Sequence, residues 1–404
     1  MPRFEPFTGL RYDPRAATLG EVIAPPYDVV SPEDRSRLAA RSPYNAIRVE
    51  LPVADEALGS DRYATAAALL EQWERDGVLR RDGDPAFYVY RMRFQSEDGS
   101  ERSTTGVIGA LALDHVGGSE VLPHERTMPK PKGDRLDLLR ACRANLSPIW
   151  GLSLSEGLAR ACAAVAASPV DAQAVDEDGV VHELWRVADP STVESIATLV
   201  AATPVVIADG HHRYETAIFY RTERQAASSG QPGAYDLVMA LIVELTSDEL
   251  VVQAIHRLVS GLPEELDVRA TLAESFEITD GPEDPADLLA AMTSVGAIGL
   301  VSPAGNLLLV PRPSILESAE ADLDSSRLDV ALATFPAHEL TYQHGTALAA
   351  DAVASGRSQL AFLLRPATVA QIADTAHSGR RMPPKTTFFH PKPRTGMVFR
   401  SVPG

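Results

Sequence analysis

A short apolar run that stops at an aspartate and a glycine constrains the fold of this chain more than any other feature. Residues 204–208 read Pro-Val-Val-Ile-Ala, and their β-branched side chains favour a short buried strand. Asp209 and Gly210 interrupt the run, and the apolar residues that follow recur at helical spacing. The sequence therefore predicts a strand that turns sharply into a helix.

The predicted turn is a candidate phosphate site. Free backbone N–H groups and the dipole at the start of a helix favour an anion, and His211, His212 and Arg213 add side-chain donors there. Asp209 has two interpretations. It is either an N-cap that accepts the first N–H bonds, or a ligand of a Mg²⁺ ion that lies between its carboxylate and a phosphate.

The length and composition predict a multi-domain α/β protein with a mixed sheet. A chain of 404 residues corresponds to two or three packed units at roughly 150 residues each, and an apolar share of 45% is sufficient for a sizeable core. We expect a main α/β domain over 1–260 and a smaller acidic α/β lobe over 261–376. A C-terminal segment over 377–404 is expected to return to the main pocket.

The net charge, the hydropathy and the cysteines indicate which partners and which cellular location to expect. A net charge of −18 argues against a general nucleic-acid surface, which requires a basic face. No run approaches about 20 apolar residues, and the N-terminus has no apolar signal-like region, so we expect no membrane partner. Cys142 and Cys162 form no Cys-x-x-Cys motif, which favours the cytoplasm. The oligomeric state is left open.

Several local elements are predicted along the chain. Ser31 fits a helix N-cap, but capping does not explain Tyr27 and Asp28 on the preceding loop. Residues 44–51 are interpreted as a strand with charges on alternate positions. An amphipathic helix over 61–75 and a hairpin across Asp98-Gly99 follow, and a later strand from Val251 is expected to end at His256-Arg257.

Two further segments carry clustered polar groups. The loop 124–135 contains Glu125, Lys130, Lys132 and Arg135, and the segment 380–392 contains Lys385. If both meet the 209–213 turn, their cations form a positive pocket suited to phosphates. Four acidic residues are candidates for a metal ligand or for a base that deprotonates a hydroxyl, and the sequence does not choose among them. They are Asp28, Glu50, Glu125 and Asp134.

Two other chemistries have less support. Zinc could be held by His211 and His212 with another histidine, but adjacent histidines point to different sides, and no H-x-x-x-H motif or cysteine pair is present. A serine or cysteine hydrolase lacks its G-x-S-x-G motif or a cysteine with a partner.

Over nearly its whole length the chain resembles the bacterial and archaeal proteins of unknown function grouped as DUF1015. The resemblance is carried by Ala24–Val29, by His124-Glu125 with Asp134-Arg135, by Asp209–Tyr214 and by Met382–Lys392. The family has no settled activity.

The Asp-Gly-x-His-Arg element also resembles the nucleotide-binding helix start of the ParB/sulfiredoxin superfamily, which includes free-serine kinases. This resemblance implies a ParB/sulfiredoxin-like nucleotide-binding core in which Gly210, His211, His212 and Arg213 hold phosphates. It also implies a glutamate base, for which Glu50 and Glu125 are candidates. The chain departs from the superfamily in its length, and in lacking both the basic DNA-binding domain of partition proteins and the catalytic cysteine setting of sulfiredoxin.

The predicted function is nucleotide-dependent transfer of a phosphoryl group to or from a small polar metabolite, such as the hydroxyl of serine. ATP or ADP with Mg²⁺ is the expected cofactor, held by the 209–213 turn and by Lys130, Lys132, Arg135 and Lys385. The predicted catalytic residues are Asp28, Glu125, Asp209 and His211. Two alternatives remain open: a nucleotide-binding switch with little turnover, and a phosphohydrolase that uses the same pocket.

Overall fold

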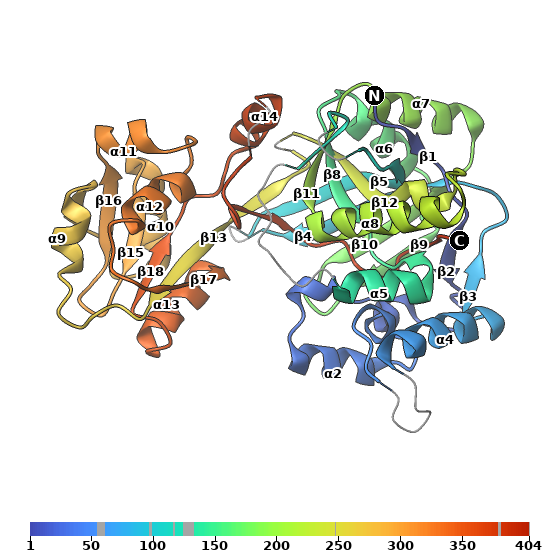
Figure 1. Ribbon diagram of the computed structural model, residues 1–404, viewed down its shortest axis with the longest axis horizontal. Coiled ribbons are helices and arrows are strands. Elements are labelled where there is room, and N and C mark those ends of the chain that lie inside the picture. The colour runs from blue at the N-terminus through green and yellow to red at the C-terminus, as the bar shows by residue number, and fades with distance from the viewer. Residues whose placement is uncertain are drawn as a thin grey trace. The chain divides into compact units, whose positions relative to one another are not determined.

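The computed structural model describes residues 1–54, 61–96, 99–115, 118–123, 133–246, 248–378 and 381–403. Across these ranges the chain forms an α/β fold (Figure 1). It divides into two compact units. Unit 1 holds the described residues up to Leu250 together with those from Pro391 onward, and unit 2 holds Val251–His390.

The bounds of these two units differ from the predicted domain ranges at two places. The strand 251–260, which was expected in the main domain, belongs to unit 2 because it pairs with three other strands of that unit. The C-terminal segment is shared, since its first part pairs within unit 2 and only residues from Pro391 onward belong to unit 1.

Within the described ranges, the main sheet of unit 1 has nine strands. They are β1 Phe4–Glu5, β4 Phe87–Gln95, β5 Glu101–Ala112, β6 Val121–Pro123, β8 Ile149–Ser153, β9 Ala172–Val175, β10 Val181–Val187, β11 Val205–Asp209 and β12 Leu237–Glu244. Their order is β6-β11-β8-β12-β5-β4-β10-β9, and β1 pairs with β5. The sheet is mixed, since β6 with β11 and β8 with β12 are parallel pairs.

A smaller sheet of unit 1 joins both ends of the chain. It has the order β3-β2-β20-β7, from β2 Gly9–Tyr12, β3 Leu79–Arg81, β7 Ala144–Asn145 and β20 Phe399–Ser401. The buried Phe399 packs into the core of the N-terminal helices. The C-terminal segment is therefore packed, as its apolar residues predict.

Helices cover both sheets of unit 1. Their bounds are α1 Leu19–Val22, α2 Pro32–Arg41, α3 Ile47–Glu50, α4 Arg62–Arg75, α5 Gly133–Cys142, α6 Leu158–Ala166, α7 Pro190–Ala201 and α8 His211–Ala227, with short 3₁₀ turns η1 Tyr27–Val29 and η2 Ala234–Asp236. Side chains of α6, α7 and α8 join the apolar cluster of the main sheet. α4 and α5 pack together beside the smaller sheet (Figure 1).

Unit 2 is a sheet with helices on both faces. Its strands are β13 Val251–Ser260, β14 Phe276–Asp280, β15 Ile298–Val301, β16 Leu307–Pro311, β17 Glu339–His344, β18 Leu360–Leu363 and β19 Thr387–His390, and its helices are α9 Val268–Ala273, α10 Pro285–Val295, α11 Pro313–Ser318, α12 Asp324–Leu332, α13 Thr346–Ala354 and α14 Val369–His377. The strand order is β14-β16-β15-β18-β13-β17, and β19 pairs with β13. Leu258 packs with α10 and α13, while Val259 packs with α9, α11 and α12. Successive side chains of a strand point to opposite faces, so both faces are covered.

Most of the predicted elements are confirmed, and two are wrong. Ser31 caps α2 by accepting the Asp34 N–H at 3.1 Å, and β4 and β5 form the predicted hairpin. The predicted strand 44–51 is instead the short helix α3, because the Asn45 side chain accepts the Ile47 N–H at 2.9 Å and starts a turn. β13 runs on to Ser260, so the His256-Arg257 pair lies inside a strand and is buried.

None of the helices in the described part of the chain has the length and hydropathy needed to cross a membrane.

Candidate functional site

β11 and α8 meet at the turn that the sequence predicts. β11 is paired on both sides, antiparallel to β8 and parallel to β6, and Val205–Ile207 are buried. Gly210 is the N-cap of α8 with φ 87°, in the left-handed region that favours glycine. A Cβ at this position would lie 3.1 Å from the guanidinium group of Arg213. Both the backbone conformation and this close contact therefore favour a glycine.

The start of α8 has no side-chain cap. Asp209 is the last residue of β11 and not the N-cap, so its interpretation as a cap is wrong. Gly210 has no side chain that could accept an N–H. The first turn of a 17-residue helix therefore presents backbone N–H groups and a positive dipole end, which favour an anion.

Asp209 is a counter-ion for two nearly buried cations. Arg213 NH2 donates to Asp209 Oδ2 at 2.7 Å, and Lys392 Nζ donates to Oδ1. Burial would raise the pKa of Asp209, but the positive charges of Lys392 and Arg213 outweigh that effect and lower the pKa. The carboxylate is therefore ionised, and one negative charge serves two positive ones.

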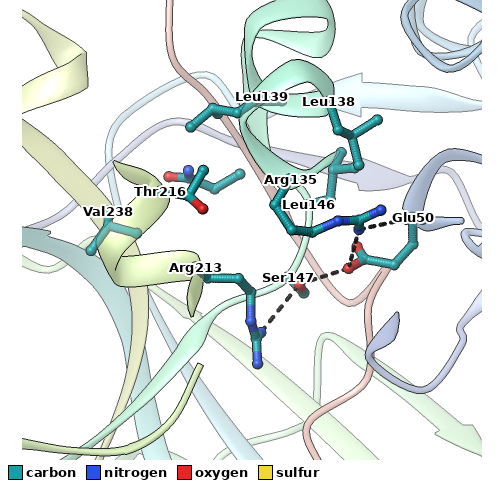
Figure 2. A pocket seen from close by; sticks show the side chains of 11 residues that line it. Glu50, Arg135, Leu138, Leu139, Leu146, Ser147, Arg213, Thr216 and Val238 are labelled. Atoms are coloured by element: carbon teal, nitrogen blue, oxygen red, sulfur yellow. Dashed lines mark hydrogen bonds and ion pairs between the residues drawn. The ribbon is translucent and has the colours of Figure 1, made fainter. Parts of the chain in front are cut away.

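A chain of polar contacts runs from Arg213 to Arg135, as Figure 2 shows. Arg213 NH1 donates to Ser147 Oγ at 3.2 Å, and Ser147 Oγ donates to Glu50 Oε1 at 3.2 Å. Arg135 NH1 donates to the backbone carbonyl of Glu50 at 2.8 Å and lies 3.7 Å from its Oε1. The four side chains come from α8, from the loop before β8, from α3 and from α5, so the fold brings distant segments together.

These four side chains line one wall of a cavity of about 60 Å³. Its other lining residues are mostly apolar: Leu138 and Leu139 of α5, Ala144 and Asn145 of β7, Leu146 of the loop that follows, Thr216 of α8 and Val238 of β12. A space of this size holds a few water molecules or a hydroxyl group, and it is too small for a nucleoside.

Glu50 is the most unusual group of the cavity. Its side chain is 3% exposed, and its Oε2 is buried with no hydrogen-bond partner among the described residues. Burial raises the pKa of Glu50, although the charges of Arg135 and Arg213 oppose the shift. A carboxylate with a raised pKa and an unpaired oxygen is suited to accept a proton from a bound hydroxyl.

Tyr27 and Asp28, which helix capping leaves unexplained, lie close to the same groups. The guanidinium carbon of Arg135 lies 4.4 Å from the centre of the Tyr27 ring, a cation–π contact. Burial raises the pKa of Tyr27 to about 12, and the charge of Arg213 opposes the shift. Asp28 is exposed and is not among the described lining residues, but its charge raises the pKa of both Glu50 and Arg213.

The two histidines occupy the first turn of α8, and both are half-buried. The charge of His211 contributes to lowering the pKa of Asp209, so His211 lies near that carboxylate. His212 Nε2 is buried without a hydrogen-bond partner among the described residues. The imidazoles are therefore positioned beside the helix start, where the sequence analysis expects them.

The structure brings only part of the predicted site together. Gly210, Arg213 and Arg135 belong to the turn and the contact chain described above. Glu125, Lys130 and Lys132 lie outside the described residues, and their roles stay predictions. Lys385 belongs to unit 2, where its backbone carbonyl accepts from Arg257 NH1 at 2.8 Å, and its role in the pocket also stays a prediction.

Two residues of the site, Ser147 and Lys392, are not assigned a role from the sequence, and Glu50 is only one of several candidates. Glu50 is one of the four candidate acids and, with Glu125, a candidate base, whereas Lys392 is named only as the end of the segment that carries the family resemblance. Ser147 had no motif at all. Its hydroxyl and the Pro148 carbonyl both accept from Arg213, a contact between distant segments that a local pattern does not reveal.

In this structure the carboxylate of Asp209 is engaged by two cations. Among the described residues no group of three or more His, Cys, Asp or Glu side chains is placed to hold an ion. The two carboxylate oxygens of Asp209 are engaged by Lys392 and Arg213. As placed here, Asp209 is a counter-ion for cations, and its role as a Mg²⁺ ligand stays a prediction.

The chain is similar to several solved structures and to one protein family. No curated protein matches the chain. Among solved structures, a free serine kinase variant in complex with AMP is 16% identical, with 70% of this chain and 89% of that chain covered and a TM-score of 0.40. A conserved hypothetical protein from Pyrococcus furiosus is 14% identical (69% and 90% covered, TM-score 0.37), and SbnI with a C-terminal truncation from Staphylococcus aureus is 11% identical (72% and 86% covered, TM-score 0.38).

Residues 4–331 match the family described as protein of unknown function, DUF1015. Because this match spans most of the sequence, the chain belongs to the DUF1015 family.

Proposed function

We propose that unit 1 is a nucleotide-dependent phosphotransferase that acts on the hydroxyl group of a small polar metabolite. The observation that carries the proposal is the buried Glu50, which has one unpaired carboxylate oxygen. A chain of donors links it through Ser147 to Arg213 at the uncapped start of α8. A proton acceptor thus lies next to a place that favours phosphate.

The nucleotide phosphates bind at the start of α8, where backbone N–H groups, Arg213 and the two histidines supply donors. ATP or ADP is the proposed donor, with Lys130, Lys132 and Lys385 as further predicted contacts. A magnesium ion enters as the complex with the nucleotide and is part of the substrate. The nucleoside lies outside the small cavity beside Glu50.

The acceptor hydroxyl enters that cavity, with serine as the leading candidate. Its oxygen attacks the terminal phosphorus, the bond from that phosphorus to the bridging oxygen breaks, and the shortened nucleotide leaves. The hydroxyl proton passes to Glu50, while Ser147 and Arg135 fix the orientation of the carboxylate. Such a transfer depends on positioning and on charge neutralisation, which this set of cations and carboxylates supplies.

A cytoplasmic location is part of the proposal, with no nucleic-acid partner. Both cysteines are free thiols, and burial raises the pKa of each to about 12, so neither is a reactive nucleophile. The acidic net charge of −18 is consistent with a small-molecule enzyme.

The test is a ³¹P NMR assay of the full chain with ATP or ADP, Mg²⁺ and a panel of hydroxyl metabolites that begins with serine. We expect a phosphomonoester product that depends on the acceptor. Glu50→Gln should lower its rate by about 10²-fold or more, the usual contribution of a general base. Glu125→Gln is the matched variant, and we expect it to retain more activity than Glu50→Gln.

Other outcomes would contradict the proposal. Release of orthophosphate that is unaffected by any acceptor would identify a phosphohydrolase. Tight nucleotide binding without turnover would favour the nucleotide-binding switch. A selective loss in Glu125→Gln would move the base to the 124–132 segment.

A further inference from the structure

The C-terminal segment crosses the candidate site of unit 1. Thr395 exchanges two backbone hydrogen bonds with Ala24, at 3.0 and 2.8 Å, just before the loop that holds Tyr27. Phe399–Ser401 then form β20 between β2 and β7. The residues of this segment from Pro391 onward belong to unit 1, which also contains the start of α8. The segment therefore makes a contribution to the site although it is far from α8 in the sequence.

That contribution is Lys392. Its side chain is 9% exposed, and its Nζ donates to Asp209 Oδ1, while Arg213 donates to Oδ2. Asp209, Lys392 and Arg213 together carry a net charge of +1, and their side chains are nearly buried. Buried charge is costly unless it is balanced, so the cluster favours one more anionic group.

The positions of the lysines along the chain also favour phosphate binding by Lys392. Of the 37 Lys and Arg residues, 33 are arginines, and the four lysines are Lys130, Lys132, Lys385 and Lys392. All four lie in the two polar segments that the sequence analysis singles out. A chain that uses arginine almost everywhere else places its compact ammonium groups there, and an ammonium group binds phosphate as a point charge.

Arg394 fixes Lys392 in place from two residues away. It donates from Nε to Asp176 Oδ2 at 2.7 Å and from NH2 to Asp178 Oδ2 at 2.6 Å, and its backbone N–H donates to Tyr90 Oη at 3.2 Å. The side chains of Arg394 and Asp176 are 7% and 4% exposed. These contacts attach the segment to Tyr90 of β4 and to Asp176, just after β9, and so support the position of Lys392 beside Asp209.

We propose that Lys392 is a phosphate-contacting residue of the site, and that Asp209 holds it and Arg213 in place until the ligand arrives. Two cations on one carboxylate suit a ligand with two adjacent phosphates, in which each phosphate takes one cation. The ligand class is therefore a pyrophosphoryl compound, such as a nucleoside diphosphate or triphosphate, rather than a monophosphate. The inference rests on the proposed function, because it assigns a residue and a ligand class to the same phosphate site.

The test is calorimetric titration of the full chain with inorganic pyrophosphate and, separately, with orthophosphate. In Lys392→Met we expect pyrophosphate affinity to fall about tenfold or more, the value of one charge-assisted contact, while orthophosphate affinity changes little. Lys392→Arg should keep most of the preference for pyrophosphate. Arg37→Met, which removes a charge from an exposed ion pair, is the control and should bind as the wild type does.

The ratio of the two affinities separates ligand contact from support of the fold. If Lys392→Met binds both probes like the wild type, or loses affinity for both equally, the assignment of Lys392 is overturned while the phosphate site stands. If the wild type binds neither probe, the proposed function fails, and this inference fails with it.

Discussion

At the scale of single residues, Glu50 is the proposed proton acceptor of the reaction. It is buried by the short helix α3, and its pKa is raised above the ordinary value of 4.5 mainly by that burial. Burial makes ionisation harder and the ionised carboxylate more basic. In the proposed reaction, the same property sets both the strength of Glu50 as a base and the pH range over which it acts.

The pH dependence of the reaction follows from that shift. Glu50 accepts a proton only when it is ionised, so kcat should fall as the pH falls through its raised pKa. The acid limb should accordingly have its midpoint above 4.5. The measurement is kcat between acid and neutral pH for the wild type and Glu50→Gln. An acid limb that persists unchanged in the residual activity of Glu50→Gln would assign it to another group.

A second prediction concerns Gly210, and Gly77 supplies its control. Gly210→Ala places a Cβ in the left-handed region and 3.1 Å from the Arg213 guanidinium, whereas Gly77→Ala has a similar φ of 74° with nothing within 4 Å. Both variants should lose about 1 kcal/mol of unfolding free energy. Only Gly210→Ala should also weaken nucleotide binding, by about tenfold, because it displaces Arg213, the proposed phosphate contact. Equal nucleotide affinities by calorimetry would show that Arg213 does not contact the ligand.

At the scale of elements, the C-terminal segment depends on one buried ion pair. Arg394→Met leaves Asp176 buried without that guanidinium, and it should lower the unfolding free energy of unit 1 by about 3 kcal/mol. Lys392 should become less well placed, so pyrophosphate binding should weaken as well. Urea unfolding and calorimetry measure the two effects, with the exposed Arg37→Met as the control. A stable variant with unchanged binding would refute the anchoring role.

The elements that the sequence predicts well are those whose signal is local. The strand and helix at 204–218 and the 61–75 helix are confirmed because their apolar periods are long enough to identify them. The helix α3 was missed because four residues are too few for a period. It depends on the Asn45 side chain, which is fully buried and also donates to the Glu21 carbonyl at 2.8 Å. That tertiary contact is invisible in a local pattern.

The candidate site also has one part that the sequence predicts and one part that it does not. The turn at 209–213 could be predicted because strand end, glycine and helix start are consecutive. The partnership of Glu50 with Ser147, and of Lys392 with Asp209, joins segments far apart in the chain. Only the sheet order and the path of the C-terminal segment bring these pairs together, and one sequence does not specify either.

At the scale of the whole molecule, the two units have separate cores and therefore separate sensitivities to conditions. Unit 2 contains His256, which is buried in β13. Its Nδ1 accepts the Leu364 N–H at 3.2 Å, and its Nε2 lies 3.3 Å from Thr346 Oγ1. Burial, aided by the charges of Arg257 and His344, lowers its pKa from 6.5 to about 4.

Unit 2 should accordingly lose stability in mild acid. Between pH 6.5 and about 4 the unfolded chain binds a proton at His256 that the folded unit does not bind. The unfolding free energy therefore falls with the pH across this window, by about 3 kcal/mol in total. Hydrogen exchange of unit 2 peptides should show this slope in the wild type and a shallower one in His256→Gln. Identical slopes would assign the pH dependence elsewhere.

The central claim is that the start of α8 binds nucleotide phosphates with Arg213, and calorimetry with ADP tests it most directly. The wild type should bind ADP, and Arg213→Ala should bind it about tenfold more weakly or worse, since a charge-assisted contact is lost. The exposed-pair variant Arg37→Ala should bind as the wild type does. If ADP binds the wild type and Arg213→Ala equally, or binds neither, the turn at Asp209–Arg213 is structural and the account is contradicted.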